Sequence, residues 1–254
     1  MTVLHVDLDN TLIFSYKHDI GKDKINVELY QGREISFLTQ KTYENLKKIK
    51  EIALIVPTST RSIEQYNRIN LHIGDIPYAL VCNGGILLTD GKKDSSWYQT
   101  SLDLIRESLP ALKAARHFLE TDIRRKFELR FIEDLFLFTK CDQPGLVVED
   151  LKKVLDTSLA DVFHNQEKVY VVPRKLSKGN ALERFQKYVK AGKIIAAGDS
   201  EFDISMLRAA DTGIAPHGFR QKFSLNFQLI EMSGSKIFSD EATEKILELC
   251  RTRN

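Results

Sequence analysis

Short hydrophobic segments that each end in polar residues alternate with amphipathic stretches over the first third of the chain. The hydrophobic segments are Val3–Val6, 52–56 and 79–82. Their nearly unbroken apolar character is typical of strands that are buried on both faces. Helices are predicted between them, over 41–50 behind an N-cap at Thr39 and over 63–70. This alternation favours a parallel sheet with crossover helices.

Two alternating segments interrupt this order close behind the first strand. Residues 25–30 and 33–37 flank Gln31-Gly32, and each alternates apolar with polar positions. The pattern predicts a β-hairpin. The sequence offers no reason for the length of this hairpin.

The pattern changes between residues 86 and 174. It predicts, in order, a helix over 102–119 divided at Pro110, a hairpin of 127–132 and 135–140 turning at Glu133-Asp134, a helix over 146–155, and a hairpin of 161–164 and 168–172. Two helices and two hairpins are enough to enclose a small core of their own. We therefore expect residues 86–174 to form a separate α+β unit.

The strand–helix alternation resumes after the insert. A helix is predicted over 177–189, a strand over 193–197, a helix over 204–210, strands over 213–215 and 227–232, and an amphipathic helix over 240–251. The predicted fold class is α/β, with a Rossmann-like parallel-sheet core from residues 1–85 and 175–254. The smaller α+β domain is inserted into this core.

Composition and charge limit the kinds of partner and metal ion that the protein is expected to bind. The 254 residues carry a formal net charge of +2, and the three cysteines are far apart in sequence. Neither a nucleic acid nor a membrane partner is expected from so small a charge and the lack of a long apolar run. Unpaired cysteines favour a cytoplasmic protein. Without Cys or His ligand spacing, any bound metal is expected to be a hard cation held by oxygen.

The candidate chemistry lies just after the predicted core strands. Asp7 and Asp9 follow the first strand, Thr58 and Ser59 the second, Asn83 the third, and Asp199 with Asp203 the strand at 193–197, while Lys178 opens a helix. Parallel strands end at one edge of a sheet, which is where ligands bind in such folds. Carboxylates that hold Mg²⁺, a hydroxyl and a lysine together suit a phosphoryl group. A carboxylate there is also placed to act as a nucleophile.

Four motifs in this order resemble those of the haloacid dehalogenase-like superfamily. They are Asp7-Leu8-Asp9-Asn10-Thr11, Ser59 after an apolar strand, Ser177-Lys178-Gly179, and Gly198-Asp199-Ser200-Glu201-Phe202-Asp203. The residues Asn83-Gly84-Gly85 and the run from Ser177 to Leu182 look like the Cof-type branch. The insert is similar to the C2-type caps of sucrose phosphatases and phosphomannomutases.

The resemblance implies a phosphatase mechanism. Asp7 would attack phosphorus to form an aspartyl-phosphate, and Asp9 would protonate the leaving oxygen and later take a proton from water. Thr11, Ser59, Arg61, Asn83 and Lys178 would bind substrate or phosphate. Mg²⁺ would be held by the group Asp7, Asp9, Asp199 and Asp203. The substrate would be a small phosphorylated metabolite such as a sugar phosphate, acted on by a monomer or weak homodimer.

Two departures from the family pattern leave alternatives open. The second motif reads Thr58-Ser59-Thr60-Arg61 where Thr-Gly-Arg is usual, so either hydroxyl of the first two residues is a candidate phosphate ligand. Phe202 replaces an asparagine of the fourth motif. Asp203 also has a reading without metal, because an acid in the first turn of a helix is stabilising by itself. Asn83 likewise has a purely structural interpretation, as part of a tight turn at the end of its strand.

Other functions and binding residues remain as alternatives at this point. A phosphomutase would return the phosphoryl group to a sugar, and a silent regulatory module would bind metal without turnover. In the insert, residues 124–126 form a basic run that either reaches an anionic substrate or is simply solvated. The residues Phe127, Phe131, Phe136 and Phe138 are expected to pack in the core of the insert.

Overall fold

The computed structural model describes residues 1–251, and the chain divides into two compact units. The first unit comprises Met1–Asp94 and the chain from Lys178 onward, and the second comprises Ser95–Ser177. The second unit is therefore an insertion into the first. None of the described helices is long and apolar enough to cross a membrane.

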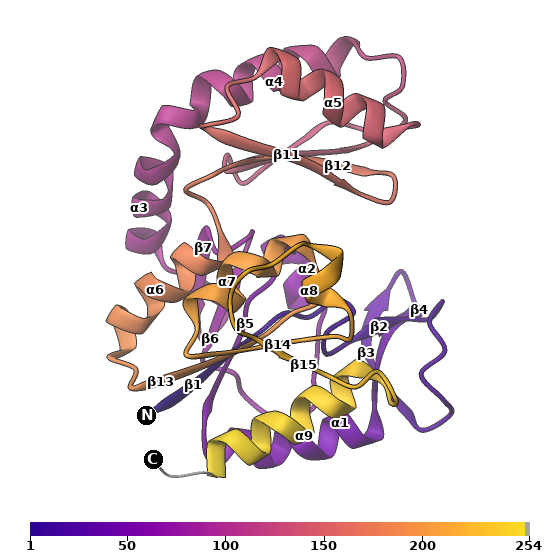
Figure 1. Ribbon diagram of the computed structural model, residues 1–254, viewed down its shortest axis with the longest axis vertical. Helices are drawn as coiled ribbons and strands as arrows, with labels where there is room; N and C mark the ends of the chain where they lie inside the picture. Colours follow the sequence, from indigo (N-terminus) through magenta and orange to yellow (C-terminus); the bar gives the residue numbers. More distant parts are fainter. Residues whose placement is uncertain (252–254) are drawn as a thin grey trace. The chain divides into compact units, whose positions relative to one another are not determined.

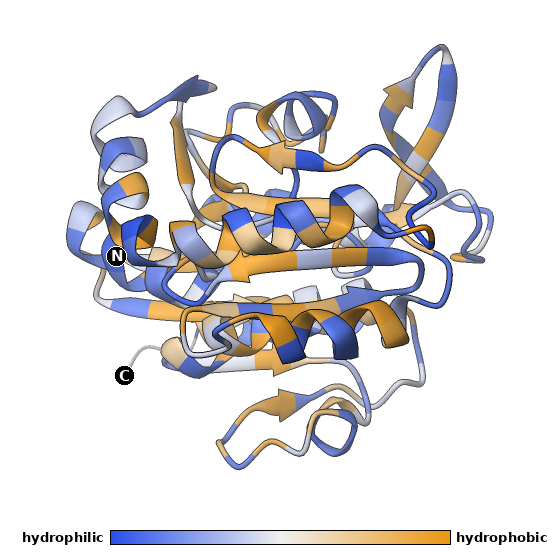
Figure 2. Cartoon of the chain, turned by 90° about the horizontal axis from the view of Figure 1, so that it is seen from above, coloured by the Kyte–Doolittle hydropathy of each residue, from blue (hydrophilic) through white to orange (hydrophobic). Residues whose placement is uncertain are grey.

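The first unit is built on a five-stranded sheet. Its order is β15-β14-β13-β1-β5, formed by β15 (Ile230–Glu231), β14 (Thr212–Ala215), β13 (Lys193–Ala197), β1 (Thr2–Val6) and β5 (Leu54–Pro57). Every neighbouring pair is parallel. The central strands are buried. Figure 2 shows that strands of the chain are coloured largely as hydrophobic. The predicted parallel α/β core is thus confirmed.

Helices cover both faces of this sheet (Figure 1). They are α1 (Gln40–Lys50), α2 (Ile63–Asn67), α6 (Lys178–Val189), η2 (Glu201–Asp203), α7 (Ile204–Ala209), α8 (Phe219–Lys222) and α9 (Phe238–Arg251). Ile195 of β13 belongs to a core cluster with residues of α1 and α9, while its neighbour Ile194 belongs to a second cluster with residues of α6 and α7. Alternate side chains of one strand therefore anchor opposite layers. Thr39 caps α1 by accepting from the N–H of Thr42, as predicted.

Two small sheets extend the first unit, and one of them corrects a prediction. The hairpin of β3 (Lys24–Tyr30) and β4 (Arg33–Thr39) is present and pairs with β2 (Phe14–Ser15). The strand predicted over 79–82 is β6 (Tyr78–Val81), which does not join the parallel sheet as a full strand. It pairs antiparallel with β7 (Ile86–Thr89), which pairs with β8 (Lys92–Lys93). Just after β5, Thr58 forms a parallel bridge with Leu80 of β6.

A tight turn explains that difference. Cys82, Asn83 and Gly84 all have positive φ, of 52°, 58° and 84°. This left-handed run reverses the chain after β6, and the buried residues that follow become a hairpin partner. Residues 86–93 therefore continue the first unit. The strand predicted over 227–232 is also shorter than expected, since β15 has only two residues.

The second unit is an antiparallel sheet with helices on one face. The strands run in the order β11 (Ala160–Asn165), β12 (Lys168–Pro173), β10 (Phe136–Lys140) and β9 (Arg130–Ile132), and the helices are α3 (Ser95–Ile105), η1 (Arg106–Ser108), α4 (Leu109–Thr121) and α5 (Pro144–Val154). Leu112, Leu151 and Val171 belong to its core. Both predicted hairpins are confirmed, and Glu133-Asp134 forms the turn of the first with positive φ at both residues. Pro110 lies in the first turn of α4, where proline is tolerated.

The contact between α6 and α7 leads to a stability prediction. A Cβ added to Gly179 would lie 2.5 Å from the carbonyl oxygen of Ser205, a backbone atom that cannot turn aside. We expect Gly179→Ala to lower the free energy of unfolding by about 1–3 kcal/mol, measured by urea denaturation. Gly192→Ala is the matched control, because the nearest atom to its Cβ would be 3.6 Å away. A Gly179→Ala variant as stable as the control would contradict the close packing of these helices.

Candidate active site

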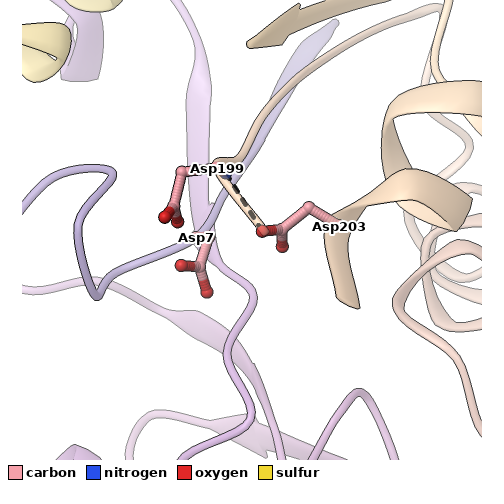
Figure 3. Close-up of side chains that lie close together, drawn as sticks. All are labelled: Asp7, Asp199 and Asp203. Atoms are coloured by element: carbon pink, nitrogen blue, oxygen red, sulfur yellow. Dashed lines mark hydrogen bonds between the residues drawn. The ribbon is translucent and has the colours of Figure 1, made fainter. Parts of the chain in front are cut away.

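Asp7 and Asp199 lie at the carboxyl ends of two neighbouring strands. Asp7 directly follows β1, and its N–H donates to the carbonyl of Ala197 at the end of β13. Two residues later the chain reaches Asp199, so the parallel pairing of β1 and β13 brings the two acids together. Figure 3 shows these carboxylates with Asp203 at this edge of the sheet. The predicted convergence of the first and fourth motifs is a direct consequence of strand order.

Lys178 is a buried cation at the start of α6. Its Nζ lies 2.5 Å from Oδ1 of Asp7 and 2.6 Å from Oδ1 of Asp203, and its side chain is only 1% exposed. Burial lowers the pKa of Lys178, but the two carboxylates outweigh this and raise it. A cation at a helix N-terminus is unfavourable, and here the two carboxylates offset that cost. Lys178 is therefore not a solvated lysine.

Asp203 organises the loop that carries Asp199. Its Oδ2 accepts from the backbone N–H groups of Asp199 (3.1 Å) and Ser200 (2.9 Å) and from the Ser200 hydroxyl. The dashed line in Figure 3 is the first of these bonds. The loop closes so tightly that a Cβ at Gly198 would lie 2.4 Å from Cγ of Asp203. Asp203 therefore stabilises a helical turn, in line with its interpretation without metal, and it also pairs with Lys178.

The three carboxylates form a site that fits a hard divalent cation. One oxygen each from Asp7, Asp199 and Asp203 lies within 4.8 Å of the others. Burial raises the pKa of Asp7 well above its usual range, against the opposing charge of Lys178. Burial and the charge of Asp203 raise the pKa of Asp199 to about 7. Three acids around one ammonium leave an excess of negative charge, which a cation bound by oxygen would neutralise.

Hydroxyl groups from two other loops lie beside this cluster. The buried Thr11 donates to Oδ1 of Asp199 at 3.1 Å. Thr58 Oγ1 donates to the carbonyl of Val56 and lies 3.0 Å from Nδ1 of His5, so its hydroxyl is engaged inside the sheet. Ser59 Oγ accepts from the N–H of Arg61 and keeps its own proton for donation. This arrangement favours Ser59 over Thr58 as the phosphate ligand.

Asn83 ties the turn after β6 to the loop after β5. Its backbone N–H donates to the carbonyl of Ser59 at 3.0 Å, and the residue is 3% exposed. The N–H of Cys82 donates to the carbonyl of Arg61 in the same way. The tight turn expected after this strand is therefore present, and its backbone hydrogen bonds also hold the loop that carries Ser59.

Asp9 and Arg61 form a pair that the sequence did not indicate. The guanidinium of Arg61 donates from Nε and Nη2 to the two carboxylate oxygens of Asp9, each at 2.8 Å. The same guanidinium donates to Glu28 of the hairpin, whose carboxylate is 1% exposed. Sequence reasoning missed Glu28. The only sequence signal for Glu28 was its acidic side chain within the alternating segment 25–30 of the hairpin.

His5 and the charged residues of the second unit have structural surroundings of their own. His5 is fully buried, packs edge-on against Phe185, and has its pKa lowered to about 3 by burial, so the ring is neutral. In the second unit, Arg124 pairs with Asp122 and Asp150. Lys126 likewise pairs with Asp142 and Glu167. Arg124 and Lys126 are thus paired with acids of their own unit, while Arg125 donates to the carbonyl of Phe127.

The expectation that four phenylalanines fill the core of the insert is correct only for Phe136, which is 2% exposed. Phe127 and Phe138 are half-buried, and Phe131 is 36% exposed. Strand alternation places Phe138 opposite Tyr170 in register, while its neighbour Leu137 belongs to the core. Phe136 and Phe138 are two residues apart on β10, so both lie on the face opposite to Leu137.

Comparison with known proteins gives a family match over part of the chain and a fold shared over nearly all of it. Residues 115–222 match the model of the haloacid dehalogenase-like hydrolases, a range that includes Lys178, Asp199 and Asp203. No match was found among curated protein sequences.

Several solved structures share the fold over nearly the whole chain. Sucrose-phosphatase from Synechocystis sp., solved with sucrose and phosphate, has a TM-score of 0.68 at 15% identity, covering 97% of this chain and 96% of that one. A haloacid dehalogenase-like hydrolase from B. subtilis has a TM-score of 0.61 at 15% identity, covering 98% and 100%. A phosphatase of this superfamily from Bacteroides thetaiotaomicron has a TM-score of 0.56 at 17% identity, covering 97% and 95%. Residues 115–222 thus match the haloacid dehalogenase-like hydrolases, and the chain shares its fold with these solved structures over nearly its whole length.

Proposed function

We propose that this protein is a Mg²⁺-dependent phosphomonoester hydrolase that acts through an aspartyl-phosphate on Asp7. The observation that carries the proposal is the carboxylate of Asp7, held at the end of β1 by Lys178 with Asp199 beside it. A nucleophile, a fixed cation and a carboxylate cluster suited to Mg²⁺ are the parts that phosphoryl transfer requires.

Asp7 would attack phosphorus with one carboxylate oxygen while the bond from phosphorus to the ester oxygen breaks. Lys178 holds that carboxylate in place and stabilises the equatorial oxygens of the phosphoryl group. Asp7, Asp199 and the main chain of Asp9 would hold Mg²⁺, with Asp203 fixing the loop. The bound ion would supply positive charge that lets an anionic ester approach a carboxylate.

Asp9 would give a proton to the leaving oxygen and later take one from the water that hydrolyses the aspartyl-phosphate. Its side chain is 48% exposed, so substrate and water have access to it. Ser59 would donate a hydrogen bond to the phosphoryl group, while Thr11 holds Asp199. Arg61 contacts Asp9 directly. We therefore assign it the role of holding Asp9 in addition to that of binding phosphate.

We propose a small phosphorylated metabolite, such as a sugar phosphate, as the substrate, and the inserted unit as the cap that selects it. The fold of sucrose-phosphatase, which was solved with sucrose and phosphate, supports a sugar in the leaving group. The expected cap spans 86–174, and the compact inserted unit is Ser95–Ser177. A cap of this kind would exclude water during transfer.

The central test is phosphate release from a panel of sugar phosphates, other phosphorylated metabolites and 4-nitrophenyl phosphate, with Mg²⁺ and with chelator. We expect Mg²⁺-dependent release by the wild-type protein. Asp7→Asn keeps the shape of the side chain but removes the nucleophile, so we expect activity to fall about a thousandfold or more.

Asp75→Asn is the control for this test, because Asp75 is an exposed carboxylate of the same unit. Equal activity of wild type and Asp7→Asn would contradict the assigned nucleophile. A wild-type protein that is inactive on every ester, but transfers phosphate when primed with a sugar bisphosphate, would point to a phosphomutase instead.

Metal binding has a test that does not need turnover. Saturating Mg²⁺ stabilises a folded protein that binds it, by about 2.7 kcal/mol at one hundred times the dissociation constant. We expect Mg²⁺ to raise the melting temperature of wild type and of Asp75→Asn. Asp199→Asn should lose this shift, because a cluster carboxylate becomes a neutral amide. A shift of unchanged size in Asp199→Asn would place the ion elsewhere.

A further inference from the structure

Glu28 is a buried carboxylate on the hairpin, outside the four motifs. It lies on β3 and is 1% exposed. Burial raises its pKa, but hydrogen bonds from Arg61 and Ser36 outweigh this and lower it, so Glu28 is ionised. A buried ionised carboxylate is costly unless it is fully paired. Its position therefore calls for an explanation.

The backbone of the hairpin is shaped to turn Glu28 inward. The register of β3 and β4 shifts on both sides of Glu28, between Asn26 and Glu28 and between Glu28 and Leu29. Such bulges redirect one side chain out of the regular alternation. Ser36 on the opposite strand donates to Oε2 of Glu28 at 2.6 Å. Glu28 also forms an isolated antiparallel bridge with Ile69, so the bulged segment is held from both sides.

Glu28 binds the guanidinium of Arg61, which also binds Asp9. Arg61 donates to Glu28 from Nη1 at 2.9 Å and from Nη2 at 3.0 Å. Its Nε donates to Asp9, and its Nη2 donates to both carboxylates. Arg68 donates to the same carboxylate from Nε at 3.1 Å. Arg68, Glu28, Arg61 and Asp9 thus form one chain of ion pairs that ends at Asp9, and Arg68 also pairs with the exposed Glu64.

Burial falls along this chain from Glu28 to Asp9. The side chain of Glu28 is 1% exposed, that of Arg61 is 12% exposed and that of Asp9 is 48% exposed. The planar fork of Arg61 binds both oxygens of this half-exposed carboxylate and so helps to fix its orientation. Arg61 in turn is fixed by the rigid, buried Glu28.

We propose that Glu28 is a positioning residue that orients Asp9 for proton transfer, acting through Arg61. This inference rests on the proposed function. In the hydrolysis of the aspartyl-phosphate, Asp9 accepts a proton from water as the carboxylate that Arg61 holds by both oxygens. When Asp9 is protonated, one oxygen still accepts from Arg61, and the other carries the proton to the ester oxygen as the bond from phosphorus to oxygen breaks.

The assignment gives the long hairpin a role in the chemistry. If the acid is misoriented, phosphoryl transfer slows for esters whose leaving group needs a proton. The rate is little changed for esters whose leaving group departs as a stable anion. Arg61 acting on the phosphoryl group alone would instead affect both kinds of ester equally. The ratio of activities on the two esters therefore separates a positioning role from a structural one.

The experiment compares kcat and KM of wild type and Glu28→Gln on the best alkyl phosphate of the panel and on 4-nitrophenyl phosphate. We expect kcat/KM, which reports only the steps up to formation of the aspartyl-phosphate, to fall about 30-fold on the alkyl ester and less than about threefold on the aryl ester. Glu34→Gln on the exposed side of the same hairpin is the matched control and should leave both rates unchanged.

Ser36→Ala keeps the proposal testable if Glu28→Gln does not fold. It removes one hydrogen bond to Glu28 and should lower the alkyl-to-aryl ratio in the same direction by a smaller factor. In a double-mutant cycle with Arg61→Ala, Glu28→Gln should have no further effect on the ratio, because its influence passes through Arg61.

An equal loss on both esters, or no loss on either, would overturn the assignment of Glu28 while leaving the phosphatase intact. An additional effect of Glu28→Gln in the Arg61→Ala background would also overturn it. A wild-type protein that hydrolyses neither ester would overturn the proposed function itself, and the role of Glu28 with it.

Discussion

The buried pairing of Lys178 with Asp7 and Asp203 is the constraint around which the first unit is arranged. Lys178 opens a helix from the second half of the chain, whereas Asp7 ends the first strand. An ammonium in this place is stable only if both carboxylates reach it, and the carboxylates are stable only with the ammonium. The pairing therefore joins the two sequence halves of the core at the point where the substrate would react.

A second charged network holds the other acid of the first motif. Asp9 is bound by Arg61, and Arg61 by the buried Glu28 of the hairpin. Asp7 and Asp9, two residues apart in sequence, are thus held by separate sets of residues. In the proposed mechanism this separation suits their tasks, since Asp7 would stay fixed toward phosphorus while Asp9 would exchange protons with a leaving group and with water.

Predictions were most reliable where the chain's own pattern decides the structure. The capped helix after Thr39 and the turn at Glu133-Asp134 depend on neighbours in sequence, and both are confirmed. The strand at β6 was placed in the wrong sheet because its apolar run is equally suited to parallel and antiparallel partners. Its pairing was decided by the left-handed turn that follows it, which brings β7 alongside.

The sequence by itself determined the fold class, the family resemblance and the convergence of Asp7, Asp199 and Lys178. Alternating strands and helices favour a parallel sheet, and the carboxyl ends of parallel strands share one edge. Only the tertiary structure decided which carboxylate pairs with which cation. Glu28 and Arg61 are far apart in sequence, and a bulge rather than a motif turns Glu28 inward. Long-range ion pairs of this kind leave no periodic signal, because they depend on the distance between side chains in the folded chain.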